Sequence, residues 1–430
     1  MRKRRPPVVE LVCVGSELLD GKADTHLGHI ALRLRAAGLR LSRETVLPDS
    51  LEPLTAGLRC ALRRCDALLV CGGLGPTFDD ITREAMAAAV GRELVFSPRL
   101  YAGIRRMFAR LGIRRPPKEN RHQAFLIRGA QALANRVGSA PGQWLAMPRQ
   151  PTLPSAPVVA LLPGPTREML PMLEREVLPR LRRACGRGLH SQALVLHLCG
   201  LPESVADQRL RPLIRQAGPE LDFTILSNTG QVDFHIFARC SSASRSRDII
   251  ARARRLALRL VGPHIFGEGP VQLEAVTGSL LRRRGLTLAV AESCTAGLLA
   301  ARLTRAPGSS GYFRGGVLAY ADEVKRGLLG VPAATLRRHG AVSSACARQM
   351  AAGARLATGA DVGVAVTGIA GPGGATKTKP VGLVFVAMSG PGRAIASSRL
   401  RFSGDREAVR QRAASAALRL LWSRLKRNEA

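Results

Sequence analysis

A single lysine in the C-terminal third of the chain stands near residues that could form a nucleophilic site. The chain has 430 residues, 65 of them Lys or Arg, and between Lys118 and Lys377 the only lysine is Lys325. Arginine stays protonated at any pH that a folded protein survives, whereas a desolvated lysine can lose its proton and act as a base. Lys325 follows Tyr320 and a Gly-Ser-Ser turn that ends at Ser310, which indicates a Ser-Lys site. A solvated lysine on a helix surface is the alternative.

The elements expected around Lys325 place it where a strand gives way to a helix. Residues 316–320 form an apolar strand, Asp322 is the expected N-cap, and Lys325 falls in the first helical turn. A helix N-terminus disfavours an ammonium group, whereas Asp322 and Glu323 would favour it if they approach. The sequence therefore leaves open whether these surroundings favour the neutral or the charged form of Lys325. The glycines around Ser310 would leave backbone N–H groups free for an oxyanion.

Three further segments place polar residues at such junctions. One apolar strand leads directly to Ser293 and Thr295, either of which could cap the next helix. Residues 364–366 form a buried strand that opens into the Gly-rich loop 367–374, whose N–H groups could face a phosphate. Arg406 opens the last helix and could hold a phosphate with two hydrogen bonds, or it could be an ordinary surface residue.

A second constellation lies near the N-terminus. The buried strand 67–71 leads into Gly-Gly-Leu-Gly-Pro-Thr, which contains Gly73 and Gly75, and then to Asp79 and Asp80 before a helix. A Gly-rich loop between a strand and a helix can surround a phosphate with N–H groups. The paired carboxylates could hold a divalent cation that bridges a pyrophosphate, and N-capping of the helix explains Asp80 equally well.

Length and pattern divide the chain into three expected domains. A chain of 430 residues is too long for one core. An α/β alternation reaches about residue 185, a small α+β module spans residues 192–267, and an α/β pattern resumes at Val271. We therefore expect domains at residues 1–188, 189–268 and 269–430.

Composition narrows the class of protein. Hydrophobic residues at 46% and charged residues at 22% are typical of a folded protein, and no apolar run is long enough to cross a bilayer. Nine scattered cysteines without paired Cys-x-x-Cys spacing indicate reduced thiols, so we expect a cytoplasmic protein. The net charge of +34 is spread along a chain with only 4% aromatic residues, so we expect nonspecific polyanion binding only.

The segment from Val271 to Leu425 resembles the C-terminal domain of the CinA family, the nicotinamide mononucleotide deamidases. The resemblance is carried by these blocks in order: Ala-Glu-Ser-Cys-Thr, Gly-Ser-Ser, Tyr320 with Lys325, His-Gly-Ala-Val-Ser, Thr-Gly-Ile-Ala-Gly-Pro, Lys-Pro-Val-Gly and Phe-Ser-Gly-Asp-Arg. It implies hydrolysis of the nicotinamide amide to nicotinate mononucleotide and ammonia without a cofactor. One position departs from the family, because Thr378 stands where Glu is usual. We also expect a homodimer.

The resemblance assigns roles residue by residue. Ser310 would be the nucleophile, and Lys325 would be its general base and then the acid for departing ammonia. Tyr320 would hydrogen-bond within this dyad. Ser309 is the nearest rival nucleophile, and Cys294 is read as a small buried helix residue. The other matched residues would position the amide or the lysine and bind the nucleotide: Ser293, Thr367, Gly368, Gly371 and Arg406. Of these, Arg406 would hold the 5′-phosphate.

The N-terminal segment resembles the molybdopterin-binding fold of CinA proteins, a MoaB/MogA-like three-layer α/β domain, and the middle module resembles the family's KH-like α+β connector. The first resemblance implies binding of ADP-ribose or a related nucleotide, and an ADP-ribose pyrophosphatase activity that depends on a divalent metal ion. Asp79 and Asp80 would bind the metal. His26 departs from the family, which usually has Asn there. The expected substrate-binding residues are Gly73, Gly75, Glu17 and Asp24.

A different class of protein is the main alternative. The chain could be a non-catalytic, nucleic-acid-associated protein of competence or DNA damage. That alternative predicts tight DNA binding at about 0.2 M salt, whereas binding by net charge alone would vanish there.

Overall fold

The structure is a computed structural model, and it describes residues 7–148, 156–185, 190–228, 230–391 and 395–427. The chain separates into two compact units. The first consists of Met1–Ala193 with Phe237–Ile250, and the second consists of Leu194–Ile236 with Ala251–Ala430. The expected boundary at residue 188 lies outside the described residues, so the three-domain division stays a prediction.

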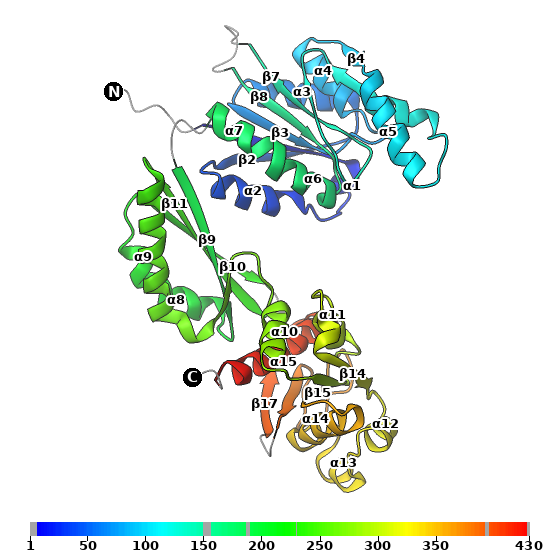
Figure 1. Cartoon of the computed structure of the whole chain (residues 1–430), viewed down its shortest axis with the longest axis vertical. Coiled ribbons are helices and arrows are strands. Elements are labelled where there is room, and N and C mark those ends of the chain that lie inside the picture. Colours follow the sequence, from blue (N-terminus) through cyan, green and yellow to red (C-terminus); the bar gives the residue numbers. More distant parts are fainter. Residues whose placement is uncertain (1–6, 149–155, 186–189, 229, 392–394, 428–430) are drawn as a thin grey trace. The chain divides into compact units, whose positions relative to one another are not determined.

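The first unit is built on a six-stranded sheet in the order β2-β1-β3-β8-β7-β6 (Figure 1). The apolar runs in β1, β3 and β8 produce strands that are buried along their whole length, as expected for a covered parallel sheet. β7 and β6 continue the sheet in antiparallel fashion. The strands are β1 (Val9–Val14), β2 (Leu41–Leu47), β3 (Ala67–Cys71), β6 (Gln131–Leu133), β7 (Gly142–Ala146) and β8 (Val158–Leu162).

Helices cover both faces of this sheet and form two cores. Ile30 and Leu34 of α2 share one core with Met169 of α6, while Leu58 of α3 and Met86 of α4 belong to the other. The expected three-layer α/β fold is therefore confirmed. The remaining elements are α1 (Ser16–Leu19), α2 (His26–Ala36), α3 (Leu51–Leu62), α4 (Thr82–Val90), β4 (Leu94–Phe96), α5 (Pro98–Arg110), η1 (Lys118–Ala124), β5 (Phe125–Ile127), α6 (Thr166–Met172), η2 (Leu173–Val177) and α7 (Leu178–Cys185).

A four-stranded sheet in the order β10-β11-β9-β12 follows in the chain. A buried polar pair joins its strands, because His197 Nδ1 lies 2.6 Å from Asp233 Oδ1 and His197 Nε2 lies 2.6 Å from the Gly269 carbonyl. The elements are β9 (His190–Cys199), α8 (Glu203–Arg215), β10 (Leu221–Asn228), β11 (Gln231–Cys240), α9 (Ala243–Val261), η3 (Gly262–His264) and β12 (Ile265–Glu268). This arrangement confirms the small α+β module.

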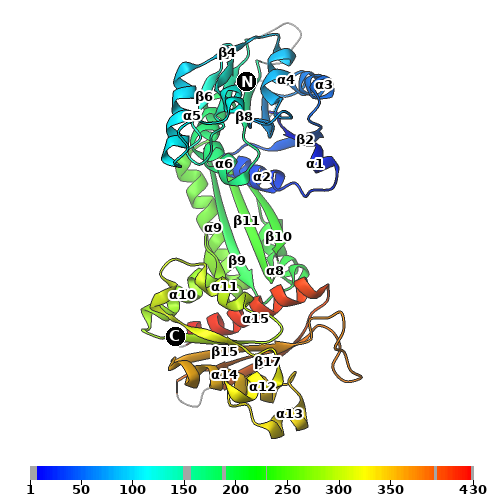
Figure 2. The same ribbon diagram turned by 90° about the vertical axis from the view of Figure 1, so that its right-hand side faces the viewer.

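The C-terminal part of the second unit is a three-layer sandwich around the sheet β14-β13-β15-β16-β17 (Figure 2). β13, β14 and β15 run parallel to one another, and β14 is an edge strand. One core lies under α10, α11 and α15, and a second lies under α14. The elements are α10 (Leu273–Arg283), β13 (Leu288–Glu292), α11 (Leu298–Thr304), η4 (Ser309–Gly311), β14 (Phe313–Leu318), α12 (Asp322–Gly327), α13 (Ala333–His339), α14 (Ser344–Thr358), β15 (Val362–Gly368), β16 (Leu383–Ser389), β17 (Ile395–Arg401) and α15 (Arg406–Arg427).

Within the described residues, no helix has both the length and the apolar character that a membrane span requires.

Candidate active site

Lys325 is a buried lysine at the carboxyl edge of the C-terminal sheet. Its side chain lies in the first turns of α12 and is only 2% exposed. Its Nζ donates hydrogen bonds to the Tyr320 carbonyl oxygen at 2.9 Å and to Asp322 Oδ1 at 3.1 Å. The N-cap of α12 is Ala321, so the expected cap at Asp322 is off by one residue. The Asp322 carboxylate is instead paired with the amine, which rules out the solvated surface lysine.

Tyr320 lies between this lysine and Arg406, but its backbone carbonyl accepts from Lys325 while its hydroxyl accepts from Arg406, so its side chain does not bond to the lysine as expected. Arg406 Nη2 donates to the Tyr320 hydroxyl at 3.0 Å, and Nη1 donates to the Gly371 carbonyl at 2.7 Å. Arg406 is the first residue of α15, as expected, and it is exposed. One guanidinium group therefore ties the segment after β14 to the Gly-rich loop after β15, while its remaining N–H groups can still meet an anion.

Ser293, Thr367 and Gly368 lie at the same edge, where the parallel strands β13 and β15 end. Thr367 is fully buried, and its hydroxyl donates to the Ala341 carbonyl at 3.0 Å. A Cβ atom on Gly368 would lie 2.7 Å from Val384 and 3.1 Å from the Cys294 sulfur, so this position needs glycine. The structure thus brings together the predicted residues at the ends of these strands: Ser293, Tyr320, Lys325, Thr367, Gly368, Gly371 and Arg406.

Ser310 does not join them. It is exposed in η4, directly before β14 begins, whereas Lys325 follows the end of β14. Since β14 is six residues long, the two residues are separated by about 16 Å of extended strand. The expectation that Ser310 and Lys325 meet within one chain is therefore wrong, and the same holds for Ser309.

The turn that carries Ser310 is also not the open amide nest that its glycines predicted. The Gly311 N–H donates to the Gly308 carbonyl at 3.2 Å, and the Tyr312 N–H donates to the Ser309 carbonyl at 3.1 Å. Gly308 has φ 77°, which favours glycine, and Arg282 Nη1 donates to the Pro307 carbonyl at 3.3 Å. Two N–H groups of this turn are thus already occupied.

Glu292 is the site-forming residue that the sequence analysis missed. It is fully buried at the end of β13, and its carboxylate accepts three hydrogen bonds of 2.8 to 3.1 Å from backbone N–H groups at the start of α11. The helix has Gly297 as N-cap without a side-chain cap, so the expected capping by Ser293 or Thr295 is wrong. Burial raises the pKa of the neighbouring Cys294 thiol to about 12, which fits the structural role predicted for it.

In the first unit, Asp80 organises the Gly-rich loop. Its Oδ1 accepts from the Gly75 N–H at 2.7 Å, and its Oδ2 accepts from the Thr77 N–H at 2.8 Å and from the Thr77 hydroxyl. Asp79 is exposed. Because both Asp80 oxygens already serve the loop, the Asp79–Asp80 pair does not fit a metal site, and its expected metal role is not supported.

The loop also rests on residues that no motif indicated. Arg83, only 1% exposed, donates to the Leu74 carbonyl at 2.7 Å and to the Gly75 carbonyl at 3.1 Å. A Cβ atom on Gly73 would lie 2.1 Å from the Thr82 hydroxyl, so the expected glycine is required by close packing. The sequence signal that could have identified Arg83 is its position at the start of the helix that follows the Gly-rich loop.

We expect Asp80→Ala to destabilise the first unit by about 2 kcal/mol, because it leaves the loop N–H groups without an acceptor. Urea unfolding followed by the fluorescence of Trp144, which is buried in this unit, would measure the change. The matched control is Asp79→Ala, for which we expect less than about 0.5 kcal/mol. Equal effects of the two substitutions would contradict the structural role of Asp80.

Asp24 belongs to a hydrogen-bonded cluster at the ends of β1 and β2. Asp24 Oδ1 lies 2.8 Å from His26 Nδ1, and His26 Nε2 lies 2.5 Å from the Gly164 carbonyl. Cys13 Sγ lies 3.6 Å from Glu44 Oε1. The ligand atoms of Cys13, Asp24 and His26 lie within 4.8 Å of one another, but both histidine nitrogens face acceptors and burial raises the pKa of the Cys13 thiol well above its usual range. The cluster therefore does not fit a metal ion either.

Glu17, the remaining expected substrate ligand, is exposed and pairs with Lys22 at 3.3 Å. It lies in α1, directly after β1, at the same end of the sheet as Asp24.

Glu44 gives this cluster a pH dependence. Partial burial, followed by its hydrogen bond with Asp24, raises the pKa of Glu44 from 4.5 to about 7. The folded state then binds a proton more tightly than the unfolded state, so we expect the free energy of unfolding to fall as the pH rises from about 4.5 to about 7. Unfolding in urea across this range, followed by Trp144 fluorescence in a Trp422→Phe background, would measure it.

We expect Glu44→Gln to flatten this pH dependence, whereas the exposed control Glu52→Gln should leave it unchanged. A Glu44→Gln profile as steep as that of the parent would contradict the assignment.

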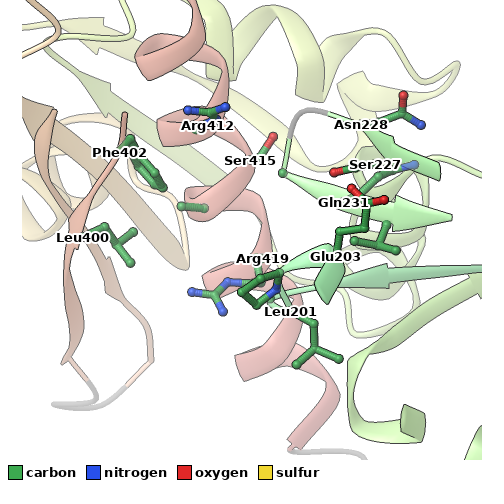
Figure 3. A pocket seen from close by; sticks show the side chains of 15 residues that line it. Leu201, Glu203, Ser227, Asn228, Gln231, Leu400, Phe402, Arg412, Ser415 and Arg419 are labelled. Carbon is green, nitrogen blue, oxygen red and sulfur yellow. The ribbon is translucent and has the colours of Figure 1, made fainter. Parts of the chain in front are cut away.

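A separate pocket of about 500 Å³ lies between α15 and the β10–β11 hairpin in the second unit (Figure 3). Figure 3 shows Arg412, Ser415 and Arg419 on α15, with Leu400 and Phe402 on one side of this helix and Ser227, Asn228 and Gln231 of the hairpin on the other. The Ser415 hydroxyl accepts from Arg302 Nη1 at 2.7 Å. The predicted site residues lie elsewhere, so this pocket is distinct from the Lys325 site.

Comparisons with known proteins find matches for both the C-terminal and the N-terminal part of the chain. Residues 271–425 match the family model described as "CinA C-terminal domain", and residues 10–183 match the one described as "Probable molybdopterin binding domain". A protein of Moorella thermoacetica is 41% identical over 419 residues, which cover 97% of this chain and 98% of its own length.

A second relative, the "CinA-like protein" of Gemmatimonas aurantiaca, is 40% identical over 413 residues, 95% of this chain and 94% of its own. Among solved structures, a "Competence-Damaged Protein (CinA) Superfamily Protein" from Klebsiella pneumoniae 700603 is 39% identical, with a TM-score of 0.35, and covers 36% of this chain and 96% of that one. Because the similarity to full-length relatives extends along almost the whole sequence, this chain belongs to the CinA family.

Proposed function

We propose that the C-terminal part of the chain hydrolyses the amide of nicotinamide mononucleotide to nicotinate mononucleotide and ammonia. The observation that carries the proposal is the buried amine of Lys325, which lies between the Tyr320 carbonyl and Asp322 at the end of a parallel sheet. A lysine kept from solvent beside a rotatable carboxylate is suited to proton transfer. Membership in the CinA family supports the same chemistry.

In this reaction the amine of Lys325 takes the proton of the Ser310 hydroxyl while the serine oxygen attacks the amide carbon, and because the two residues lie apart within one chain, the serine is that of a second copy in the expected homodimer. Collapse of the tetrahedral intermediate breaks the C–N bond, and the lysine returns the proton to the departing ammonia. Water then hydrolyses the ester to nicotinate mononucleotide and free serine. Asp322 pairs with the amine between these steps, and its exposed carboxylate can turn away as the proton leaves.

Arg406 would bind the 5′-phosphate of the substrate. Its guanidinium group is exposed, and the two hydrogen bonds to Tyr320 and Gly371 fix its position. A positioned guanidinium suits a phosphate better than a mobile one, because less side-chain entropy is lost on binding. Thr367 and Ser293 would shape the site from the neighbouring strand ends.

The test is ammonia release from nicotinamide mononucleotide by the purified full chain, measured with a coupled glutamate dehydrogenase assay. We expect turnover by the parent chain and loss of about a thousandfold in Lys325→Met. Release by the parent no faster than by Lys325→Met would refute the proposal.

A second activity is favoured by the Gly-rich loop of the first unit, at a strand-to-helix junction, where Asp80 accepts from the Gly75 and Thr77 N–H groups and Arg83 donates to the Leu74 and Gly75 carbonyls. We propose that this loop binds the pyrophosphate of ADP-ribose or a related nucleotide. Whether the bound nucleotide is hydrolysed is tested by assaying AMP formation from ADP-ribose with and without added Mg²⁺. Absence of both ADP-ribose binding and AMP formation would remove this candidate.

A further inference from the structure

We propose that the pocket of about 500 Å³ beside α15 is a further ligand site, which binds a nucleoside monophosphate with its phosphate on Arg419. The inference goes beyond the deamidase and the nucleotide-binding loop and depends on neither. Among the described residues, none of those assigned to these two functions lines this pocket.

Four segments that are distant in the sequence form the pocket. α15 provides one wall, the turn before α8 and the end of β17 provide two more, and the β10–β11 hairpin provides the fourth (Figure 3). Binding sites for small molecules commonly have volumes of about 300 to 1,000 Å³. The space is therefore large enough for a mononucleotide.

Arg419 is a charged group in this pocket that the chain itself leaves without a partner. Three arginines of α15 are half-buried among the described side chains, and two of them, Arg410 and Arg412, donate to the backbone carbonyls of Thr295 and Ser403. Arg419 makes no hydrogen bond or ion pair with any residue that the structure describes. Because a partly buried, unpaired charge costs free energy, its guanidinium group is suited to an anion.

Close packing holds this guanidinium group at the pocket. A Cβ atom on Gly200 would lie 2.5 Å from Arg419 Nη1 and 2.9 Å from its Cδ, and Gly200 has φ 79°. The turn therefore lies directly against the arginine side chain, and only glycine leaves room for it. Less side-chain entropy is lost when a ligand binds a group that is already positioned.

The same turn begins α8, whose N-terminus adds to the positive potential. The N-cap is Pro202, which has no side-chain acceptor. Within the described ranges, the N–H groups of Glu203 and Ser204 meet no acceptor. Free N–H groups at a helix N-terminus favour a bound anion. The start of α8 therefore supports the assignment that rests on Arg419.

The charge of Arg419 also acts on its neighbours. The pKa of His264 is lowered first by burial and then by positive charges, among them Arg209 and Arg419. Glu203 lines the pocket as well, but it is exposed and forms no ion pair with Arg419. The positive charge at this end of the pocket is therefore not neutralised by the described residues.

The remaining walls indicate what the anion is attached to. Leu201, Leu400 and Phe402 provide apolar surface, whereas Ser227 and Gln231 provide a hydroxyl and an amide group. An inorganic anion would leave the apolar surface unfilled, and an acyl chain would leave the polar groups unpaired. A nucleoside monophosphate uses both, because its base packs on apolar and aromatic side chains while its ribose and base edge form hydrogen bonds.

Substitution of Arg419 tests the site. We expect calorimetric titration of the full chain with AMP to show a binding event that Arg419→Met weakens at least about tenfold, since methionine keeps an unbranched side chain against Gly200 without the charge. The matched control is Arg424→Met, at an exposed arginine of the same helix, which should leave AMP binding unchanged. An Arg419→Met titration identical to that of the parent would overturn the inference.

Glu203→Gln is expected to act in the opposite direction. It removes the carboxylate among the described lining residues, so this AMP-binding event should tighten about threefold. Unchanged or weaker binding would place the phosphate away from this wall and contradict the proposal.

The ligand class is tested with adenosine and inorganic phosphate as separate probes. We expect AMP to bind at least about tenfold more tightly than either of them at the site that Arg419→Met removes. Phosphate that binds as tightly as AMP would exclude recognition of the nucleoside, and adenosine that binds as tightly would exclude recognition of the anion. Either result would overturn the assignment.

Photolabelling locates the ligand and separates this site from the other two proposals. We expect 8-azido-AMP to label the walls of the pocket, such as Phe402 or Gln231, and excess AMP to prevent it. Labelling confined to the first unit or to the surroundings of Lys325 would overturn this site and leave the other two proposals standing. A chain that releases no ammonia but is labelled at Phe402 would refute the deamidase alone.

Discussion

Lys325→Arg is expected to reduce ammonia release from nicotinamide mononucleotide by about a thousandfold while leaving the chain folded. The substitution keeps the positive charge that pairs with Asp322, but a guanidinium group cannot lose its proton at neutral pH. The larger arginine head must also fit a position that is only 2% exposed. Steady-state kinetics would measure the loss, and circular dichroism would confirm the fold.

The matched control for this prediction is Lys426→Arg, at an exposed lysine near the end of α15 whose amine lies over the Trp422 ring. We expect that variant to keep parental kcat/KM. Substantial activity in Lys325→Arg would exclude proton transfer by this residue and reduce its role to charge alone.

Glu292→Ala is expected to destabilise the second unit by about 3 kcal/mol, because three backbone N–H groups at the start of α11 lose a buried acceptor. Urea unfolding followed by the fluorescence of Trp422, which belongs to the core that α11 covers, would report the change. We expect Glu292→Gln to lose less stability than Glu292→Ala, since one carbonyl oxygen remains as an acceptor.

The exposed Glu323 provides the control, and Glu323→Ala should change the free energy of unfolding by less than about 0.5 kcal/mol. A Glu292→Ala variant as stable as this control would mean that water or a rearranged α11 replaces the carboxylate.

The sheets were predictable from sequence because continuous apolar runs leave few alternatives. Residues 67–71 form a strand with the predicted bounds, as expected when both faces of a strand are buried. The carboxyl-edge position of Tyr320 and Thr367 also followed from pattern, since parallel strands end at one edge of their sheet.

Pairing of Ser310 with Lys325 was not predictable in the same way. The two residues are only fifteen positions apart in the sequence, but the extended strand between them places them at opposite ends of the sheet. Capping by Glu292 was missed for a related reason. Capping preferences favour the short side chains of Ser293 and Thr295, whereas the glutamate at the end of β13 meets the start of α11 only because of the way the chain folds. At Asp80, one carboxylate satisfies several N–H groups of its own loop, which motif spacing cannot separate from metal binding.

The guanidinium bridge between Tyr320 and Gly371 has a consequence for substrate selectivity. If Arg406 binds the 5′-phosphate at one end of the nucleotide, the same group also fixes the side chain of Tyr320, the residue whose carbonyl oxygen accepts from Lys325. Free nicotinamide, which has no phosphate, would then bind more weakly and also be turned over more slowly, because binding energy at the phosphate helps to position the groups at the reacting centre. A chain built in this way would distinguish a nucleotide from its detached base mainly through kcat.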